Sequence, residues 1–226
     1  MAFNKLTRGQ DNAGFQLLEK RGVTEEDWIR MLSDVRLVQG VADLLVESRM
    51  SNLLIPISTI LNPATTNPFV AKDKFVVNTK RNAPVKINYL GDNFKAWFLN
   101  GDGKIEDPIN EQTLHYAKLR KTSVDGPIIE ELGGKARAET TLTEMFSLME
   151  KQKNGEGGVL LNNSYANIFY IKDQNGVLRA VLVFWCDVGW HVLAFSVESP
   201  GGWSDGLQVF SRNSVLESSE PVPAAS

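Results

Sequence analysis

The only Cys of the chain, Cys186, and one of its two His, His191, lie five residues apart in the stretch AVLVFWCDVGWHVLAFSV, residues 180–197. A thiol and an imidazole within reach of one another are the nucleophile and general base of one class of hydrolases and transferases. If Val188-Gly189 is a two-residue turn, Cys186 lies directly opposite His191 in a hairpin, where cross-strand Cβ atoms are about 4.5–5.5 Å apart. This spacing therefore allows the two side chains to touch.

The neighbouring residues favour a structural role for the same stretch. Cys186 shares its face of the strand with Leu182 and Phe184, and the opposite face is also apolar. Strands that are apolar on both faces are covered on both, and burial raises a thiol pKa, which is the wrong direction for a nucleophile. A three-residue loop at 187–189 would also place Cys186 opposite Trp190. We therefore expect this hairpin to be core rather than a catalytic pair.

Other motifs that can bind ions or phosphate are incomplete. Residues 100–106, NGDGKIE, resemble the middle of a calcium loop, but the first and twelfth ligand positions fall on Phe98 and Ile109. His115, Cys186 and His191 lack the paired spacing of zinc ligands. The run at 155–158 lacks the Lys-Ser/Thr ending of a phosphate loop. We expect no metal ion and no cofactor.

Two segments are candidate binding surfaces. The stretch 198–206, ESPGGWSDG, is long for a connection between strands, and long loops on rigid sheets often carry binding sites. Its Trp is a favoured interface anchor, although it can also fold back over the core. Basic residues follow a predicted strand at 114–119. The predicted binding residues are Trp203, Asp205, Glu198, Lys118, Arg120 and Lys121.

Three functions stay open at this stage. A non-enzymatic protein-interaction module is favoured, because no complete set of acid, base, nucleophile or metal ligands is found. The first alternative is a small hydrolase or transferase with a site at the strand-end loops around 198–206, and its candidate residues are Asp125, Glu198, Asp205, Arg212 and His115. The second is RNA or nucleotide binding through a local basic surface made of Lys80, Arg81, Lys118, Arg120 and Lys121.

Composition limits the class of protein. The 226 residues suit one domain, or one domain with an appendage, and 42% hydrophobic residues are enough for a core. The net charge of −3 argues against a general nucleic-acid or membrane-surface binder. One Cys cannot form an internal disulfide, and no segment approaches the about 18 apolar residues of a membrane span. The first residues lack an apolar stretch of signal-peptide length, so we expect a cytoplasmic protein.

Local signals divide the chain into three parts. Thr24 with Asp27 predicts one helix start and Ser33-Asp34 predicts another, within a helical N-terminal segment of residues 1–62. Prolines at 56, 63 and 68 predict an extended linker or an irregular strand over 51–69. An α+β domain is expected over 63–214 and a disordered tail over 215–226.

The expected fold is α+β, with an antiparallel sheet, a C-terminal meander and helices that cover the sheet. Strands are predicted at 74–79, 84–89, 114–119, 167–172, 178–186, 190–197 and 207–212, and helices at 92–99, 125–132 and from Thr140 or Thr141 to 151. Asn175-Gly176 predicts a two-residue hairpin turn, which would put Phe169 and Ile171 on the same face as Leu182.

Five stretches of the chain carry a resemblance to a protein family. These are SVDGPIIEELGG (123–134), AETTL (138–142), NGEGGVLL (154–161), YANIFYI (165–171) and VFSRNS (209–214). Together they resemble an uncharacterised family of small bacterial proteins over about residues 70–214. The resemblance implies a domain with a variable helical addition before it. It implies no activity, cofactor or catalytic residue.

Overall fold

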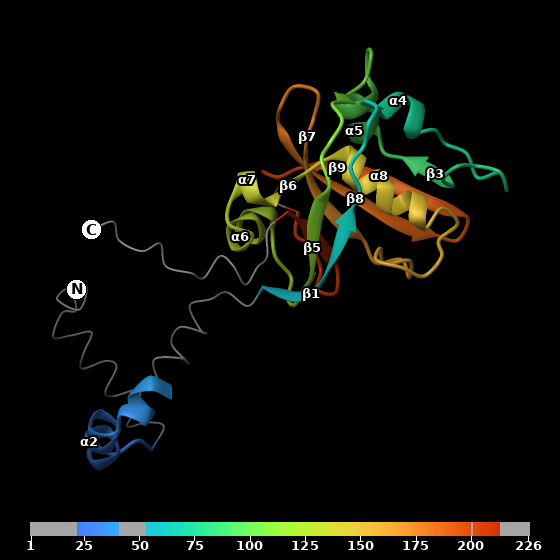
Figure 1. The fold of residues 1–226 in the computed structure, drawn as a ribbon. Coiled ribbons are helices and arrows are strands. Elements are labelled where there is room, and N and C mark those ends of the chain that lie inside the picture. Colours follow the sequence, from blue (N-terminus) through green and yellow to red (C-terminus); the bar gives the residue numbers. More distant parts are fainter. Residues whose placement is uncertain (1–21, 41–52, 200, 213–226) are drawn as a thin grey trace. The chain divides into compact units, whose positions relative to one another are not determined.

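The computed structural model describes residues 22–40, 53–199 and 201–212 (Figure 1). The chain divides into two compact units, Met1–Ser51 and Asn52–Ser226. A first helix expected from residue 12 and the expected tail at 215–226 lie outside the described residues.

The described part of the N-terminal unit is helical, as predicted. Helix α2 spans Glu25–Ser33, and a second helical stretch covers residues 35–40. Thr24 and Asp27 form a reciprocal capping box, in which the Asp27 backbone N–H donates to the Thr24 hydroxyl and the Thr24 backbone N–H donates to the Asp27 carboxylate. Asp34 accepts from the backbone N–H of Arg36 at the start of the second stretch. Both predicted helix starts are confirmed.

The C-terminal unit is built on a mixed sheet. The strands of this unit are β1 (Leu54–Asn62), β2 (Phe69–Val70), β3 (Ile87–Leu90), β4 (Ile105–Glu106), β5 (Gln112–Leu119), β6 (Glu139–Thr140), β7 (Asn167–Lys172), β8 (Leu178–Cys186), β9 (Gly189–Ser196) and β10 (Gln208–Ser211). β2 and β4 form a separate two-stranded sheet. Its helices are α4 (Ala71–Lys74), α5 (Asp92–Phe94), the π-helix η2 (Lys95–Leu99), α6 (Asp125–Glu131), α7 (Lys135–Ala138) and α8 (Leu142–Lys151).

Among the described residues, the large sheet has the order β1-β5-β10-β7-β8-β9-β3, with β6 also paired to β7. β7, β8 and β9 pair in sequence as antiparallel neighbours. β10 does not continue them: it lies between β5 and β7 and runs parallel to β7. β3 is parallel to β9. The fold is therefore α+β, but the expectations of a purely antiparallel sheet and of a meander completed by residues 207–212 are wrong.

Helices cover both faces of the sheet. α8 packs its apolar residues on one face, against β7, β8, β9 and β10 (Figure 1). α6 and α7 contribute to a second cluster on the opposite face. The central strands consequently have a core on each side, as their two apolar faces predict.

The first strand corrects the predicted domain boundary. Residues 54–62 form β1, which pairs with β5 through most of its length. The boundary therefore lies between residues 51 and 52, not between 62 and 63. Pro56 misled the prediction, because it sits in an edge strand beside a register shift between Pro56 and Ser58, where a missing N–H is tolerated. The strand expected at 74–79 is also wrong, since α4 ends at Lys74 and only Asn78 makes an isolated bridge.

The β7–β8 hairpin shows how loop length sets the register. The loop holds Gly176 at φ 76°, so the predicted turn residue is present. However, Lys172 pairs with Leu178, and the Asp173 N–H donates to the Val177 carbonyl, so the loop has three residues, 174–176, rather than two. The shift pairs Ile168, not Phe169, with Leu182. A shift of one residue moves every side chain to the other face, so the expected face of Phe169 is wrong.

Candidate functional site

The hairpin of residues 180–197 does not form a Cys–His pair. Its turn is Asp187-Val188, with Asp187 at φ 46°, so Cys186 pairs with Gly189 and His191 lies opposite Phe184. The His191 ring packs 5.0 Å from the Phe184 ring centroid, and its Nε2 lies 3.0 Å from the Asn88 amide. Partial burial lowers the pKa of His191. These contacts fit a structural role for this hairpin and not a catalytic Cys–His pair.

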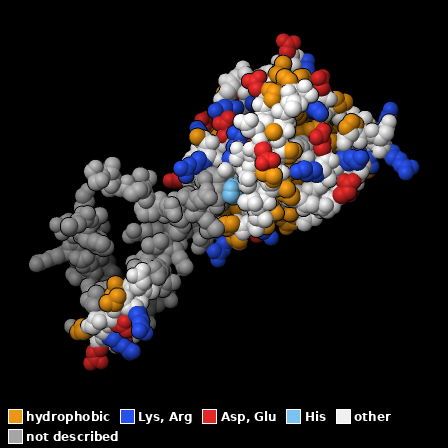
Figure 2. Space-filling view, in the orientation of Figure 1, with side chains coloured by type: hydrophobic (Ala, Val, Ile, Leu, Met, Phe, Trp, Pro, Cys, Tyr) orange, Lys and Arg blue, Asp and Glu red, His pale blue; other side chains and the backbone are white. Residues whose placement is uncertain are grey.

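A groove of about 610 Å³ lies where β1, β5 and β10 meet two loops. The sheet contributes Ile55, Ile57, Lys118, Leu119 and Gln208, and the loops contribute Arg120, Leu161, Asn163, Tyr165, Asp205 and Gly206. Figure 2 shows hydrophobic side chains exposed beside Lys and Arg side chains on the part of this unit where Figure 1 places β1 and β5. Three of the six predicted binding residues, Lys118, Arg120 and Asp205, therefore meet in one concave surface.

The groove combines apolar walls with free positive charge. Ile55, Ile57 and Tyr165 are 46%, 49% and 47% exposed, which is high for large apolar side chains. Lys118 and Arg120 form no ion pair with any residue that the structure describes. Such a surface suits a ligand that is partly apolar and carries negative charge.

Buried amides hold the loop wall of the groove, which is formed by Leu161, Asn163 and Tyr165. Asn167 lies fully buried at the start of β7, and its side chain accepts from the Leu161 N–H at 2.9 Å and donates to the Leu161 carbonyl at 3.1 Å. Gln208 donates to the Val159 carbonyl at 2.7 Å. Ser164 takes φ 69°, a conformation that non-Gly residues rarely adopt. The wall is thus fixed by specific hydrogen bonds rather than by local preference.

The opposite loop brings a glycine against the aromatic ring of the groove. Gly206 has φ 87°, and a Cβ at this position would lie 2.8 Å from Tyr165 Cε1. A side chain here would be strained and would displace the ring. The residue therefore fixes how closely the 205–206 segment approaches Tyr165.

The remaining predicted binding residues do not line the groove. Trp203 is a half-buried lid residue: it packs edge-on against Phe195 at 5.6 Å and donates from Nε1 to Asp125 Oδ1 at 2.7 Å. This is the folded-back arrangement considered from the sequence. Lys121 and Glu198 are exposed, but neither is a lining residue.

Asp125 is the buried centre of this loop attachment. Its side chain is almost fully enclosed, and Oδ1 also accepts from the Tyr170 hydroxyl at 2.9 Å. Its Oδ2 has no hydrogen-bond partner among the residues that the structure describes. Desolvation raises the pKa of the carboxyl, against the opposing effect of the bonds from Trp203 and Tyr170. The Tyr170 pKa is raised well above its ordinary value, first by burial and then by the Asp125 charge.

We expect this carboxyl to make stability depend on pH. Because its pKa is higher in the folded protein than in the unfolded chain, its contribution is fully present below about pH 4 and is lost as pH rises through the raised pKa. Asp125→Asn removes the titration. Urea unfolding of both proteins from about pH 4 to 8 measures the difference.

The free energy of unfolding of Asp125→Asn should rise relative to that of the wild type as the pH rises. Asp205→Asn, at an exposed position, should show no such trend. A constant difference for Asp125→Asn across the pH range would contradict the assignment.

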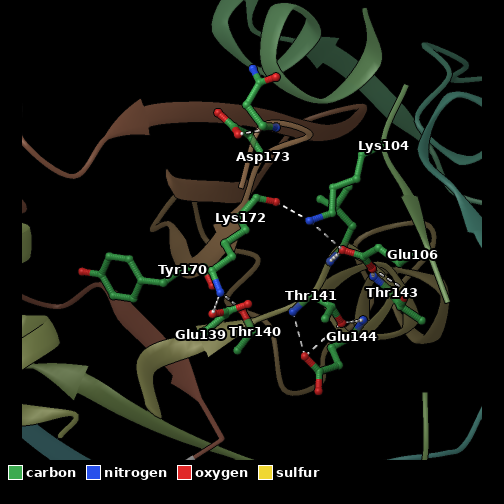
Figure 3. Close-up of polar contacts among 12 residues, drawn as sticks. Lys104, Glu106, Glu139, Thr140, Thr141, Thr143, Glu144, Tyr170, Lys172 and Asp173 are labelled. Carbon is green, nitrogen blue, oxygen red and sulfur yellow. Dashed lines mark hydrogen bonds and ion pairs between the residues drawn. The ribbon is translucent and has the colours of Figure 1, made fainter. Parts of the chain in front are cut away.

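A second polar cluster lies at the N-terminus of α8 (Figure 3). Thr141 and Glu144 form a capping box at this helix start, which the sequence predicted at Thr140 or Thr141. Glu106 accepts from the backbone N–H groups of Leu142 and Thr143 at 3.0 and 2.8 Å, and Lys104 lies 3.4 Å from it. These acids are occupied by the helix end, so the cluster is a structural anchor.

The five candidate catalytic residues are not assembled into one site. Arg212 pairs with the buried Glu144 on the α8 side at 2.9 Å, while Asp125 lies at the start of α6 on the opposite side of the sheet. His115 lies in β5, where it pairs with Thr59 of β1 and with Ser211 of β10. Asp205 lies in the groove. Glu198 is exposed outside the groove. This dispersal gives the hydrolase or transferase hypothesis no constellation of acid, base and nucleophile among the described residues.

The predicted basic surface is also divided. Lys80 and Arg81 lie in the loop before β3, at one edge of the sheet, whereas Lys118 belongs to β5 beside the opposite edge strand β1. The expectation that these residues converge is wrong. Only Lys118 and Arg120 share the groove.

In the part of the chain that the structure describes, no cluster of His, Cys, Asp and Glu could hold a metal ion. No helix in that part is long and apolar enough to span a membrane. Comparison of the chain with models of protein families, with curated proteins and with solved structures found no match. The family resemblance seen in the sequence stays a prediction, and the groove is the feature from which a function is inferred.

Proposed function

We propose that this protein is a non-enzymatic protein-interaction module, and that its groove binds an extended, acidic segment of a partner protein. The observation that supports this most is the meeting of exposed Ile55, Ile57 and Tyr165 with Lys118 and Arg120 in one concave surface. The free energy falls when a partner covers exposed apolar side chains, and the two cations favour a partner of negative charge.

The size and openness of the groove fit a peptide segment. A volume of about 610 Å³ lies in the range of pockets that enclose a small molecule or a few side chains. The groove continues to the edge of the sheet at β1, so a longer chain can enter and leave it. Tyr165 supplies a rigid aromatic surface of the kind enriched in protein interfaces.

A single-stranded RNA is the competing ligand, because bases stack on aromatic rings and phosphates bind Lys and Arg. Asp205 in the groove and the exposed isoleucines oppose it, since a phosphate backbone gains nothing from either. The net charge of −3 also disfavours association with a polyanion. A peptide with both apolar and acidic residues uses all of these groups.

The test is selection from a display library of random peptides of about twelve residues on the full-length protein, with counter-selection on Lys118→Glu/Arg120→Glu. We expect enrichment of Asp and Glu together with β-branched residues. The double variant should bind the selected peptides about tenfold or more weakly, because like charges then face each other. Affinities are measured by fluorescence anisotropy at two salt concentrations.

A matched control carries the same charge change elsewhere. Lys135→Glu/Arg137→Glu reverses two exposed cations, also two residues apart, on α7. It should leave the affinities within about twofold. Failure to select any peptide that distinguishes the wild type from the groove variant would overturn the proposal. Salt-dependent binding of a fluorescent oligonucleotide that is lost in the same variant would favour RNA instead.

A further inference from the structure

β1 is an edge strand with an unusually open outer side. Among the described residues it pairs with β5 alone, although it is nine residues long. Ile55, Ile57 and Leu61 are each about half exposed. Long edge strands with exposed apolar side chains are templates for pairing with another chain.

The first half of β1 is protected against such pairing. The Glu131 carboxylate accepts from the N–H groups of Leu53 and Leu54 at 3.2 and 3.0 Å. Pro56 has no N–H, and the register shift that follows it bends the strand. Proline, a bulge and a covering charge are three devices that prevent edge pairing.

The second half, residues 58–62, has no proline and no register shift, and the Lys151 ammonium contacts its backbone at the Leu61 carbonyl. Its sequence, STILN, contains no Pro and no charge. The Arg120 N–H donates to the Leu53 carbonyl at 2.8 Å, so the even-numbered residues of β5 direct their backbone groups toward β1.

Alternation along the strand then assigns the open backbone groups. Ser58 and Ile60 pair with even-numbered β5 residues, so their backbone N–H and C=O groups point toward β5. Thr59 and Leu61 therefore present N–H and C=O groups to the outer edge, where the Lys151 ammonium donates to the Leu61 carbonyl at 3.4 Å. The Thr59 N–H and C=O groups and the Leu61 N–H can bond a further strand.

We propose that the acidic partner segment adds to the sheet as a strand along residues 58–62 of β1, and that its charged end turns into the groove where Pro56 stops the pairing. This inference rests on the proposed function and specifies its binding mode. Lys118 pairs with Ile55, just beyond that stop, so the cations lie where the segment leaves the edge. Main-chain bonds then supply affinity, and the groove supplies the preference for acidic residues.

The test compares Thr59→Pro with Thr59→Ala in the full-length protein, with the peptides selected on the wild type as probes. Proline removes the outward N–H but is tolerated in an edge strand when that N–H faces solvent. We expect Thr59→Pro to raise Kd about tenfold or more and Thr59→Ala to change it by about twofold or less. Circular dichroism and thermal melting establish that both variants are folded.

Hydrogen exchange of the wild type gives a second readout that does not depend on a variant. Bound peptide should slow exchange of the Thr59 and Leu61 amides, because they become donors to the added strand. Equal affinities for Thr59→Pro and Thr59→Ala, or unchanged exchange at both amides, would overturn strand addition. The groove proposal would survive that result, because it fails only when Lys118→Glu/Arg120→Glu has no effect.

Discussion

Glu106→Ala is expected to lower the free energy of unfolding of the C-terminal unit by about 3 kcal/mol or more, and its melting temperature by about 10 °C. Glu106, in β4, caps the N-terminus of α8. It accepts from the backbone N–H groups of Leu142 and Thr143 and from the Thr143 hydroxyl at 2.6 Å. Removal of the carboxylate leaves those donors without a charged acceptor at a site where the Glu106 side chain is 7% exposed.

The loss is expected to be large because a cation is also affected. The Lys104 side chain is only 15% exposed, and its Nζ contacts the Lys172 carbonyl as well as Glu106 (Figure 3). Breaking a buried pair from one side leaves an uncompensated charge, which costs more than the pair contributes. Glu106→Gln keeps an acceptor without the charge and should fall between wild type and Glu106→Ala.

Glu139→Ala is the matched control. Glu139 pairs with Lys172 at 2.7 Å, a shorter contact than that of Lys104 with Glu106, but the two side chains are 27% and 49% exposed. Exposed pairs contribute at most about 1 kcal/mol. Urea unfolding followed by tryptophan fluorescence compares the variants. Equal losses for Glu139→Ala and Glu106→Ala would mean that burial does not determine the effect.

Local sequence signals predicted the elements whose ends are set by neighbouring residues. The capping box of Thr141 and Glu144 began α8 where expected, and Thr24 with Asp27 began α2. Glu106 could not be found in this way, because it caps α8 from a position 36 residues earlier in the chain. A cap from a distant strand leaves no spacing in the sequence.

Strand order and register were less predictable, because they depend on loop conformations and on contacts between distant strands. The turn at Asp187-Val188 uses φ 46° at an Asp, whereas the sequence suggested Val188-Gly189. That shift alone separates Cys186 from His191. The place of β1 in the sheet was missed, because Pro56 is informative only once its position at the sheet edge is known.

The groove was predicted in part. Lys118, Arg120 and Asp205 were named as binding residues because charged residues after strands and in long loops often form sites. Tyr165, Ile55 and Ile57 were not, since their apolar side chains give no sign in the sequence that they stay exposed. Trp203 was named for its size, but the buried Asp125 carboxylate holds it against the sheet. Only the tertiary fold separates these cases.

Asn167→Leu is expected to affect both stability and binding. The buried Asn167 amide joins the Leu161 main chain to β7 and also donates to the Val183 carbonyl at 3.1 Å. Leucine has the same number and branching of side-chain heavy atoms but no polar atoms, so the Leu161 N–H and the two carbonyls lose their partners. Unsatisfied buried groups cost about 1–3 kcal/mol each, and we expect a total loss of about 3 kcal/mol in the free energy of unfolding.

Binding should weaken in the same variant, because Leu161 lines the groove and is held by Asn167. Asn162→Leu is the control: it makes the same substitution at the next residue of that loop, where the exposed side chain bonds, within the described part of the chain, only the Gly155 carbonyl. It should cost under about 1 kcal/mol and leave peptide affinity nearly unchanged. If Asn167→Leu were as stable as Asn162→Leu, the buried amide would not hold the wall. If it were destabilised but bound the selected peptides normally below its melting temperature, the Leu161 wall would not contribute to recognition, and affinity would have to come from the β1 edge and the two cations.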